Sequence, residues 1–335
     1  MPVPFAINGL GRIGRALVRV AQERPEIELV AANDSAVPEQ LARLLRHDTV
    51  HGRFPGEVGY DSGALVIDGR RLPLSREADP AKIPWAASGA RVVVESTGRF
   101  RSRELAQAHL GGSVERVIVS AVASGVDATF CMGINHRTYD PARHVVVSNA
   151  SCTTNCLAPV AMILDRHFGL VRGLMNTVHC LTNSQNIVDM AHSDPRRARA
   201  AGHNIIPTTS DAIPSIGLVL PELEGRIDGL AMRVPIVAGS LVDLTAQLER
   251  PASRAAMTTA FRDAERGELR GVLGTTDEEL VSSDFIGDPR SAIVDLPLLE
   301  EVGERLVRVI AWYDNEWGYT HRLADLIAHL GSPVE

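Results

Sequence analysis

The chain has 335 residues, of which 45% are hydrophobic and 22% charged, and its formal net charge at pH 7 is −7. This length predicts two domains, each large enough to bury its own core. The acidic balance argues against a general nucleic-acid-binding surface. Because no apolar run reaches membrane-spanning length and the first residues do not resemble a secretory leader, we expect a cytoplasmic protein without a membrane partner.

The first half of the chain opens with a dinucleotide-binding pattern. An apolar strand over residues 4–8 runs into Gly9-Leu10-Gly11-Arg12-Ile13-Gly14, and a second strand follows over 27–32 after a helical stretch. The glycines permit a tight turn and the close approach of a pyrophosphate to backbone N–H groups. Asp34 follows the second strand, where a carboxylate binds ribose hydroxyls and favours NAD over NADP. A glycine-rich structural turn is the alternative interpretation.

Three further apolar runs, over residues 65–67, 91–94 and 116–119, predict more strands of the same half. The pattern is typical of a doubly wound parallel sheet that ends near residue 150. Residues that follow the carboxyl ends of such strands face the cofactor, and here they include 95–98 and Ser120.

The second half of the chain has a different hydrophobic pattern. Alternating stretches over 230–234, 240–249 and 306–313 predict a mainly antiparallel sheet, with helices over 156–167 and 254–268 on one face. The fold class is therefore α/β, with a Rossmann domain and an α+β catalytic domain.

An amphipathic helix follows this second half and is predicted to return to the first domain. We therefore assign residues 1–150 together with 319–335 to the dinucleotide-binding domain, and residues 151–318 to the catalytic domain.

A cysteine stands at the junction of the two halves. Cys152 lies between a strand over 145–147 and the helix predicted over 156–167, in the stretch Ser148-Asn149-Ala150-Ser151-Cys152-Thr153-Thr154-Asn155. A thiol beside the unpaired N–H groups of a helix N-terminus favours the thiolate, which is the attacking form. The hydroxyls of Ser151 and Thr153 suit a cap or an oxyanion. A buried structural cysteine is the alternative.

The other three cysteines are Cys131, Cys156 and Cys180. No C-x-x-C pair is present, so in a reducing compartment we expect neither a disulfide framework nor a metal site. Cys156 lies four residues after Cys152, which leaves a redox pair open, although core packing is the simpler role.

A base for this thiol is predicted further along the chain. His179 ends an apolar strand over 174–178, and it follows Cys152 by enough residues for one helix and one returning strand. That return would bring the imidazole beside the thiol, where it can exchange protons with an adduct. A hydrogen-bonded core histidine is the alternative. No role is assigned to the other histidines, which include His51, His109, His136 and His192.

Anion ligands complete the candidate set. Arg196-Arg197-Ala198-Arg199 is a compact basic run, Arg233 is the lone charge in an apolar strand, and Thr182 and Thr208-Thr209-Ser210 offer hydroxyls. Arginine forks and hydroxyls suit phosphate groups. A solvated face is the alternative for the run, and an ion pair with Asp243 for Arg233. Together with the thiol and the base, these groups suggest oxidation of a phosphorylated aldehyde through a thioester.

Several of these stretches, above all residues 148–159 and Trp312-Tyr313-Asp314-Asn315-Glu316-Trp317-Gly318-Tyr319, resemble the glyceraldehyde-3-phosphate dehydrogenase family over essentially the whole chain. The resemblance implies a homotetramer in which residues 183–202 reach towards a neighbour, with glyceraldehyde 3-phosphate and inorganic phosphate as substrates. It implies Cys152 as nucleophile, His179 as base, and Thr182 and Arg233 as ligands of the substrate phosphate.

The resemblance also implies two larger sets of site residues. The attacking phosphate would be lined by Ser151, Thr153, Arg197 and Ser210. NAD would be contacted by Gly9, Gly11, Arg12, Ile13, Asp34, Thr97, Ser120 and Asn315.

The chain departs from the family's pattern near the phosphate site. Asp211 replaces a glycine, and its carboxylate would repel a phosphate dianion by up to about 4 kcal/mol at 4 Å and an effective dielectric of 20. Pro214 changes the backbone behind it, and Met190-Ala191 weakens the preference for NAD over NADP.

Our hypothesis is an accessory or inhibitor-tolerant isoform with an altered phosphate pocket. The alternatives are an erythrose-4-phosphate dehydrogenase that releases its product with water, and a non-catalytic NAD-binding regulator.

Overall fold

The computed structural model describes residues 1–332 and divides the chain into two compact units. Unit 1 comprises Met1–Phe130, His136–Ala150 and Thr320–Glu335, and unit 2 comprises Cys131–Asn135 and Ser151–Tyr319. The prediction that residues 319–335 return to the first domain extends over 333–335, which lie outside the described residues. No helix within residues 1–332 is both long and apolar enough to cross a membrane.

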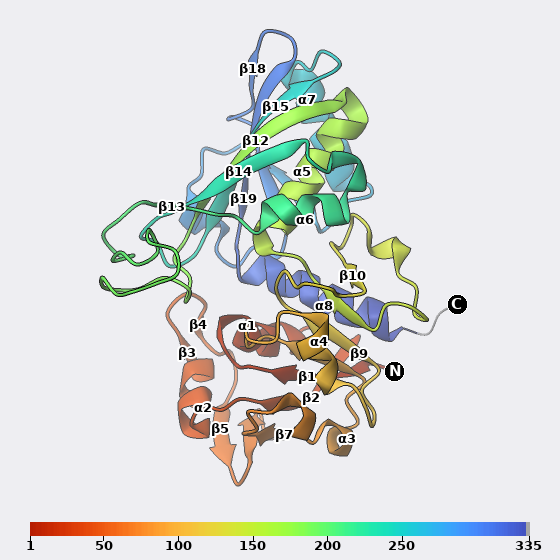
Figure 1. Cartoon of the computed structure of the whole chain (residues 1–335), viewed down its shortest axis with the longest axis vertical. Coiled ribbons are helices and arrows are strands. Elements are labelled where there is room, and N and C mark those ends of the chain that lie inside the picture. Colours follow the sequence, from red (N-terminus) through yellow and green to blue (C-terminus); the bar gives the residue numbers. More distant parts are fainter. Residues whose placement is uncertain (333–335) are drawn as a thin grey trace. The chain divides into compact units, whose positions relative to one another are not determined.

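Unit 1 is built on a nine-stranded sheet, shown in the red-to-yellow part of Figure 1. The strand order is β10-β11-β9-β8-β1-β2-β7-β6-β5. Their bounds are β1 Val3–Asn8, β2 Ile27–Asn33, β5 Val58–Asp61, β6 Ala64–Ile67, β7 Arg70–Ser75, β8 Val92–Glu95, β9 Arg116–Val119, β10 Ala128–Thr129 and β11 Val146–Ser148. The pair β3 His47–Asp48 and β4 Gly52–Arg53 is separate.

The parallel strands of this sheet wind outward from β1 in both directions. The neighbours β8 and β2 both run parallel to β1, whereas β5 and β6 pair antiparallel at one edge. The predicted strand at 65–67 therefore belongs to an antiparallel extension. The helices are α1 Arg12–Ala21, α2 Pro38–Arg46, α3 Trp85–Ser88 and α4 Arg103–Ala106. The strand order reverses at β1, and open α/β sheets generally bind ligands at the carboxyl ends of the strands beside such a reversal, which here are β1 and β8.

Unit 2 contains an eight-stranded mixed sheet. The order is β13-β14-β12-β15-β19-β17-β16, and β18 also pairs with β19. The bounds are β12 Leu170–His179, β13 Ile206–Thr208, β14 Ile227–Arg233, β15 Ser240–Leu248, β16 Leu273–Thr276, β17 Ala292–Asp295, β18 Glu300–Val302 and β19 Leu306–Tyr313. Most pairs are antiparallel, as the alternating sequence predicted, whereas β12–β14 and β16–β17 are parallel.

Helix α5, Cys152–Phe168, forms the core of unit 2. It packs against β12, β15, β17 and β19 and contacts α6 Ala212–Val219 and α7 Arg254–Arg266, which Figure 1 shows beside it. Every residue from Thr153 to Leu164 is buried. The sequence predicted that this helix begins at Cys156. It begins one turn earlier because the Ser151 hydroxyl accepts from Thr154 N–H and caps the helix there. The last helix, α8, covers Trp317–Gly331.

Candidate active site

Cys152 is the first residue of α5. Its neighbour Ser151 is in an extended conformation and caps the helix, with Thr154 N donating to Ser151 Oγ at 3.0 Å. Cys152 as a whole residue is partly exposed, whereas Cys131, Cys156 and Cys180 are buried, and all four cysteines are free thiols. This cysteine stands at the positive end of a seventeen-residue helix, the position predicted for a nucleophile.

His179 is the last residue of β12 and lies beside this thiol. The distance from Cys152 Sγ to His179 Nε2 is 3.5 Å. The side chain is 3% exposed, and its ring packs edge-on against Tyr313 at 6.1 Å between centroids. The adjacency that the sequence predicted, through one helix and one returning strand, is present in unit 2.

Arg233 is brought to the same place by strand pairing. It ends β14, which runs parallel to β12, and the register sets Arg233 opposite His179. Arg233 Nη1 lies 2.6 Å from His179 Nδ1 and 3.3 Å from the carbonyl oxygen of Cys180. Its Nε is buried and has no hydrogen-bond partner in the structure. The alternative ion pair with Asp243 is wrong, because Asp243 pairs with Arg308 at 2.7 Å.

The imidazole is held in its neutral form. Burial lowers the pKa of His179, and the nearby Arg233 charge lowers it further, to about 3. A hydrogen bond from Nδ1–H to the Cys180 carbonyl, at 2.9 Å, opposes these effects. In that tautomer Nε2 carries a lone pair directed at Cys152 Sγ, and it is able to accept the thiol proton.

The thiol does not have the depressed pKa expected from its helix position. Burial raises the pKa of Cys152, and this effect exceeds the opposing influence of Arg233 and of the hydrogen bonds from Thr153. The sequence could not show this desolvation, because it arises from the packing of β12 and β19 around the helix N-terminus. Both pKa shifts favour the uncharged forms, a thiol beside a neutral imidazole.

Tyr313 is a residue that the sequence analysis did not assign to the site. It ends β19 and is 1% exposed, and its hydroxyl bridges Thr153 Oγ1 at 2.9 Å and Thr177 Oγ1 at 3.0 Å. Burial raises its pKa well above the ordinary value, so the phenol stays neutral. It joins the start of α5 to β12, and its position in the distinctive 312–319 stretch was the only sequence signal.

Arg197 and its partners form a second group in unit 2. Arg197 Nε donates to Thr208 Oγ1 at 2.8 Å and Nη2 donates to the Thr209 carbonyl at 3.3 Å. Thr208 in turn donates to Asp194, which lies 3.5 Å from the guanidinium. Ser210 Oγ accepts from Ala212 N at the start of α6. The arginine run is thus not simply a solvated face, because Arg197 is tied to the 208–210 segment.

Asp211 occupies the N-cap position of α6 without capping it. Its side chain is exposed and makes no cap hydrogen bond, while its carbonyl oxygen accepts from Ser215 Oγ at 2.6 Å. Thr182, the remaining predicted phosphate ligand, exchanges a hydrogen bond with Ser184 at 2.9 Å.

In unit 1 the three glycines of the predicted phosphate loop each have a distinct role. Gly9 has φ +99°, and a Cβ there would lie 2.8 Å from Thr97 N. A Cβ on Gly14 would lie 2.0 Å from the Gly9 carbonyl oxygen, so this glycine permits close contact of α1 with β1. Gly11 faces open space and N-caps α1 without a side chain. The start of α1 thus presents a helix N-terminus of the kind that binds a pyrophosphate.

The residues around this loop support the same ligand. Asp34 Oδ2 accepts from Leu10 N at 2.7 Å, which puts the carboxylate predicted to bind ribose next to the loop. Ile13 and Ser120 are partly exposed, and Arg12 pairs with Asp48.

The remaining predicted cofactor ligand, Asn315, belongs to unit 2. Its Oδ1 accepts from the buried Cys180 thiol at 3.1 Å, which leaves its amide N–H groups as donors.

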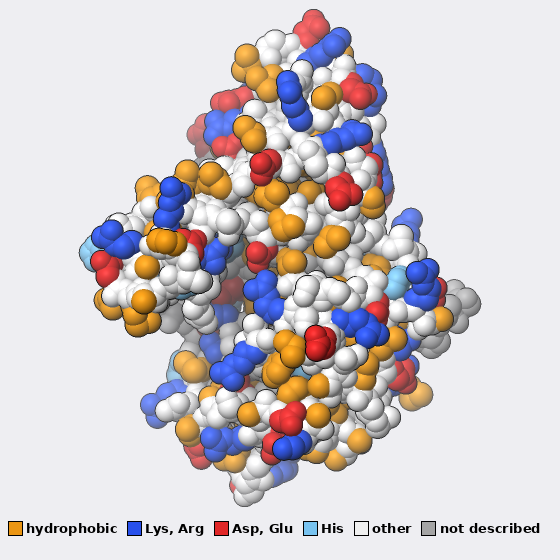
Figure 2. All heavy atoms as spheres, viewed as in Figure 1, with side chains coloured by type: hydrophobic (Ala, Val, Ile, Leu, Met, Phe, Trp, Pro, Cys, Tyr) orange, Lys and Arg blue, Asp and Glu red, His pale blue; other side chains and the backbone are white. Residues whose placement is uncertain are grey.

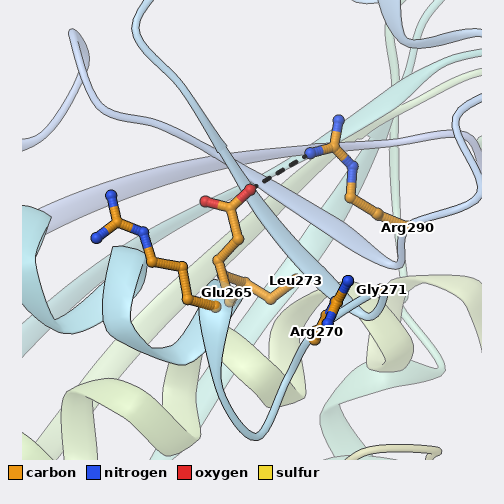
Figure 3. A pocket seen from close by; sticks show the side chains of 6 residues that line it. Glu265, Arg270, Gly271, Leu273 and Arg290 are labelled. Carbon is orange, nitrogen blue, oxygen red and sulfur yellow. Dashed lines mark ion pairs between the residues drawn. The ribbon is translucent and has the colours of Figure 1, made fainter.

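Unit 2 also has a pocket that contains none of the predicted site residues. It has a volume of about 560 Å³, and its lining is Glu265, Arg266, Arg270, Gly271, Leu273 and Arg290. Figure 3 shows the Glu265 carboxylate directed at Arg290, with an N–O distance of 3.7 Å. Its one carboxylate, Glu265, is paired with Arg290, so we assign it no catalytic role.

A dinucleotide loop in one unit and a Cys–His–Arg constellation in the other define a thiol-dependent nicotinamide dehydrogenase. Family models for the glyceraldehyde 3-phosphate dehydrogenase NAD binding domain and C-terminal domain match residues 3–103 and 151–315. The chain is 48% identical to glyceraldehyde-3-phosphate dehydrogenase 1 of Bacillus cereus, with 98% of each chain covered. It is also 48% identical to the Geobacillus stearothermophilus enzyme over 99% of each, and 46% identical to the Streptomyces coelicolor enzyme over 100% of each. The chain belongs to the glyceraldehyde-3-phosphate dehydrogenase family.

Proposed function

We propose that the chain catalyses the NAD-dependent oxidation of glyceraldehyde 3-phosphate with inorganic phosphate to 1,3-bisphosphoglycerate. The observation that carries this proposal is the 3.5 Å approach of Cys152 Sγ to His179 Nε2, with Arg233 beside the imidazole. Family membership supports the same reaction and favours neither the erythrose-4-phosphate alternative nor the non-catalytic one.

Cys152 and His179 divide the covalent chemistry. Cys152 Sγ adds to the aldehyde carbon while His179 Nε2 takes the thiol proton and passes it to the carbonyl oxygen, which gives a hemithioacetal. His179 then removes the proton of that hydroxyl as the hydride leaves the same carbon, and a thioester remains on Cys152. Bound NAD supplies the hydride acceptor. An oxygen of inorganic phosphate attacks the thioester and the C–S bond breaks. The sulfur leaves as a thiolate and takes back the proton that His179 holds, which restores the starting pair.

Two groups of residues are proposed to hold the phosphates. Arg233 and Thr182 bind the phosphate of the substrate, and the partnerless Nε of Arg233 is one donor left for it. Ser151, Thr153, Arg197 and Ser210 line the position of the attacking phosphate.

The cofactor is proposed to bind along the loop between β1 and α1. Its pyrophosphate meets the backbone at Gly9, Gly11, Arg12 and Ile13, and its ribose hydroxyls meet Asp34. Thr97 and Ser120 follow the carboxyl ends of β8 and β9, and Asn315 donates to the nicotinamide carboxamide. The Asp34 carboxylate favours NAD, although NADP use stays open.

We further propose a homotetramer that acts in the cytoplasm, where its four free cysteines stay reduced. The loop of residues 183–205 between β12 and β13, drawn in green in Figure 1, exposes Ile187, Val188, Met190 and Ile205. Figure 2 shows orange side chains on the surface of this loop. Such exposed apolar side chains support burial against further subunits.

An aldehyde panel tests the proposed reaction. The purified protein is assayed with glyceraldehyde 3-phosphate or erythrose 4-phosphate and with NAD or NADP, each with and without inorganic phosphate. We expect sustained NADH formation only with glyceraldehyde 3-phosphate and phosphate. Equal turnover without phosphate would replace the proposal by hydrolytic release, and a burst without turnover would support a non-catalytic role. Light scattering of the same sample gives the subunit number.

A further inference from the structure

Four adjacent strands of unit 1 end on side chains that hydrogen-bond to one another. The last residues of β7, β2, β1 and β8 are Ser75, Asn33, Asn8 and Glu95. The strand register pairs Ser75 with Asn33, Asn33 with Asn8, and Asn8 with Glu95. These four residues, called the edge ladder below, cross the carboxyl edge of the sheet.

The hydrogen bonds of the edge ladder run in one direction. Ser75 Oγ donates to Asn33 Oδ1 at 2.8 Å, Asn33 Nδ2 donates to Asn8 Oδ1 at 2.8 Å, and Asn8 Nδ2 donates to Glu95 Oε2 at 2.6 Å. The polarity is fixed, because the backbone N–H of Glu77 also donates to Asn33 Oδ1 at 2.8 Å. Each amide therefore has only one usable orientation.

Glu95 ends the ladder as a buried carboxylate that only accepts. It is 1% exposed, and Asn8 and Asn33 are each 2% exposed. Besides Asn8, it accepts from Thr97 N at 2.8 Å, from Thr97 Oγ1, and from His109 Nε2 at 3.0 Å. Four donors thus satisfy its two oxygens.

His109 does not neutralise this charge. Trp85 Nε1 donates to His109 Nδ1 at 3.1 Å, so Nδ1 is an acceptor and the imidazole carries its hydrogen on Nε2. No arginine or lysine pairs with Glu95 in the part of the chain that the structure describes. A buried carboxylate without a counter-ion is expensive, and an apolar residue would hold the strands together at lower cost.

The edge ladder instead coincides with the proposed cofactor loops. Gly9 and Asp34 each follow a ladder residue directly, and Thr97 follows Glu95 by two positions. The backbone ties them to the ladder as well: Gly9 N donates to the Asn33 carbonyl at 2.8 Å, and Ser96 Oγ donates to the Gly9 carbonyl at 2.6 Å. Each loop thus begins at a point that the ladder fixes.

We propose that the edge ladder is the positioning element of the dinucleotide site, with Glu95 setting both the Gly9 turn and Thr97 before the cofactor arrives. None of its members needs to touch the ligand. The ladder lowers the ordering cost of binding, because the loops are already in place. This inference rests on the proposed cofactor site at the Gly9–Gly14 loop.

The isosteric change Glu95→Gln is the first test. The glutamine has only one carbonyl oxygen for the two acceptor positions of Glu95. Its amide N–H groups must face either Asn8 Nδ2 and His109 Nε2 or the Thr97 N–H, so one side of the Glu95 contact is lost in either orientation. We expect the Kd for NAD, measured by calorimetry on the full-length protein, to rise at least tenfold.

The matched control is Asp127→Asn. Asp127 accepts from Val145 N and Val146 N at the amino end of β11, away from the loops. Its replacement should lower the Tm without changing the Kd for NAD.

A double-mutant cycle separates positioning from simple damage. Asn8→Asp alone sets two carboxylates together, whereas Asn8→Asp with Glu95→Gln restores a donor facing an acceptor. We expect the double variant to bind NAD more tightly than the product of the two single effects predicts. Ser75→Ala changes the partly exposed far end of the ladder and should raise the Kd for NAD a few-fold. This variant is the replacement test if the variants at buried positions do not fold.

Two results would overturn the inference. One is a Kd for NAD in Glu95→Gln, or in Ser75→Ala where the former does not fold, that equals the wild-type value or rises no more than in Asp127→Asn. The other is a double variant that binds NAD no more tightly than the product of the two single effects predicts. If the wild-type protein itself does not bind NAD, the proposed cofactor site is wrong, and this outcome is distinct from either.

Discussion

Arg233 Nη1 lies 2.6 Å from His179 Nδ1, on residues that face each other across the parallel pair β12–β14. A guanidinium only donates, and the Cys180 carbonyl at 2.9 Å from the same Nδ1 only accepts. One nitrogen cannot serve both partners, so two tautomers of His179 compete. Only the tautomer that donates to Cys180 leaves Nε2 free as a base towards Cys152.

Removing the Arg233 charge should therefore change His179 as well as substrate binding. In Arg233→Leu we expect the KM for glyceraldehyde 3-phosphate to rise at least tenfold, because a charged phosphate ligand is lost. The pKa of His179, about 3 in the wild type, should rise because one of the two effects that lower it is removed. A proton NMR titration of the histidine ring signals measures this shift. An unchanged His179 pKa would show that burial alone holds the imidazole neutral.

The pH dependence of thiol alkylation tests the electrostatics of Cys152. Burial raises the pKa of this thiol above its ordinary value of 9.0. The alkylation rate of the free protein with iodoacetamide should thus still be rising at pH 9, since the thiolate is the reactive form. No inflection from His179 is expected between pH 5 and 8, because its pKa is about 3. A plateau below pH 7 would show instead that the thiol and imidazole exist as an ion pair. Cys152→Ala is the control, because Cys131, Cys156 and Cys180 are buried.

His179 has its own kinetic prediction. His179→Asn keeps a polar side chain but removes the base, so kcat should fall by about 10² to 10⁴ while the KM values change little. Stopped-flow measurement of NADH formation in the first turnover locates the defect in the chemical steps. A variant with a wild-type first turnover would show that His179 does not act as the base.

The local sequence was sufficient to predict the parts of the fold that depend on neighbouring residues. The β1–loop–α1 unit follows from glycine spacing, and the approach of His179 to Cys152 follows from one helix and one returning strand. The helix start at Cys152 was missed because the cap at Ser151 outweighs the apolar pattern that begins later. The pKa direction of Cys152 and the role of Tyr313 depend on how β19 packs, which local sequence does not contain.

The edge ladder illustrates the same limit. Asn8, Asn33 and Glu95 look like ordinary polar strand ends when each is taken alone. The register of four strands brings these side chains into hydrogen-bonding contact. The three-dimensional structure is also needed to show that Glu95 is buried and that no arginine or lysine pairs with it in the described part of the chain. His109, which had no role in the sequence analysis, proves to be buried against the Glu95 carboxylate.

Asp211 is predicted to weaken phosphate binding. Its exposed carboxylate stands at the N-cap of α6, one residue after Ser210, and a dianion bound at Ser210 and Arg197 would be repelled. Asp211→Gly should lower the KM for inorganic phosphate several-fold with little change in kcat, and high salt should reduce the difference. Steady-state kinetics with varied phosphate measures both. Equal KM values would refute the hypothesis of an accessory isoform with an altered phosphate pocket.

The carboxylate of Asp48 should make the free energy of unfolding depend on pH in the acid range. Burial raises the pKa of Asp48, but the N–H groups of His51 and Val50 and the Arg12 guanidinium outweigh this effect and bring the pKa to about 2, below the ordinary value of 3.8. Because the folded-state pKa is depressed, the charged form stabilises the native state above pH 4, and this contribution is lost as the pH falls from 4 to 2. Asp48→Asn should therefore lower the free energy of unfolding at pH 7 by on the order of 1 kcal/mol. Urea denaturation of both proteins at a series of pH values measures the difference. It should shrink towards zero near pH 2, and a difference that stays constant over this range would mean that the carboxylate acts through its shape and not through its charge.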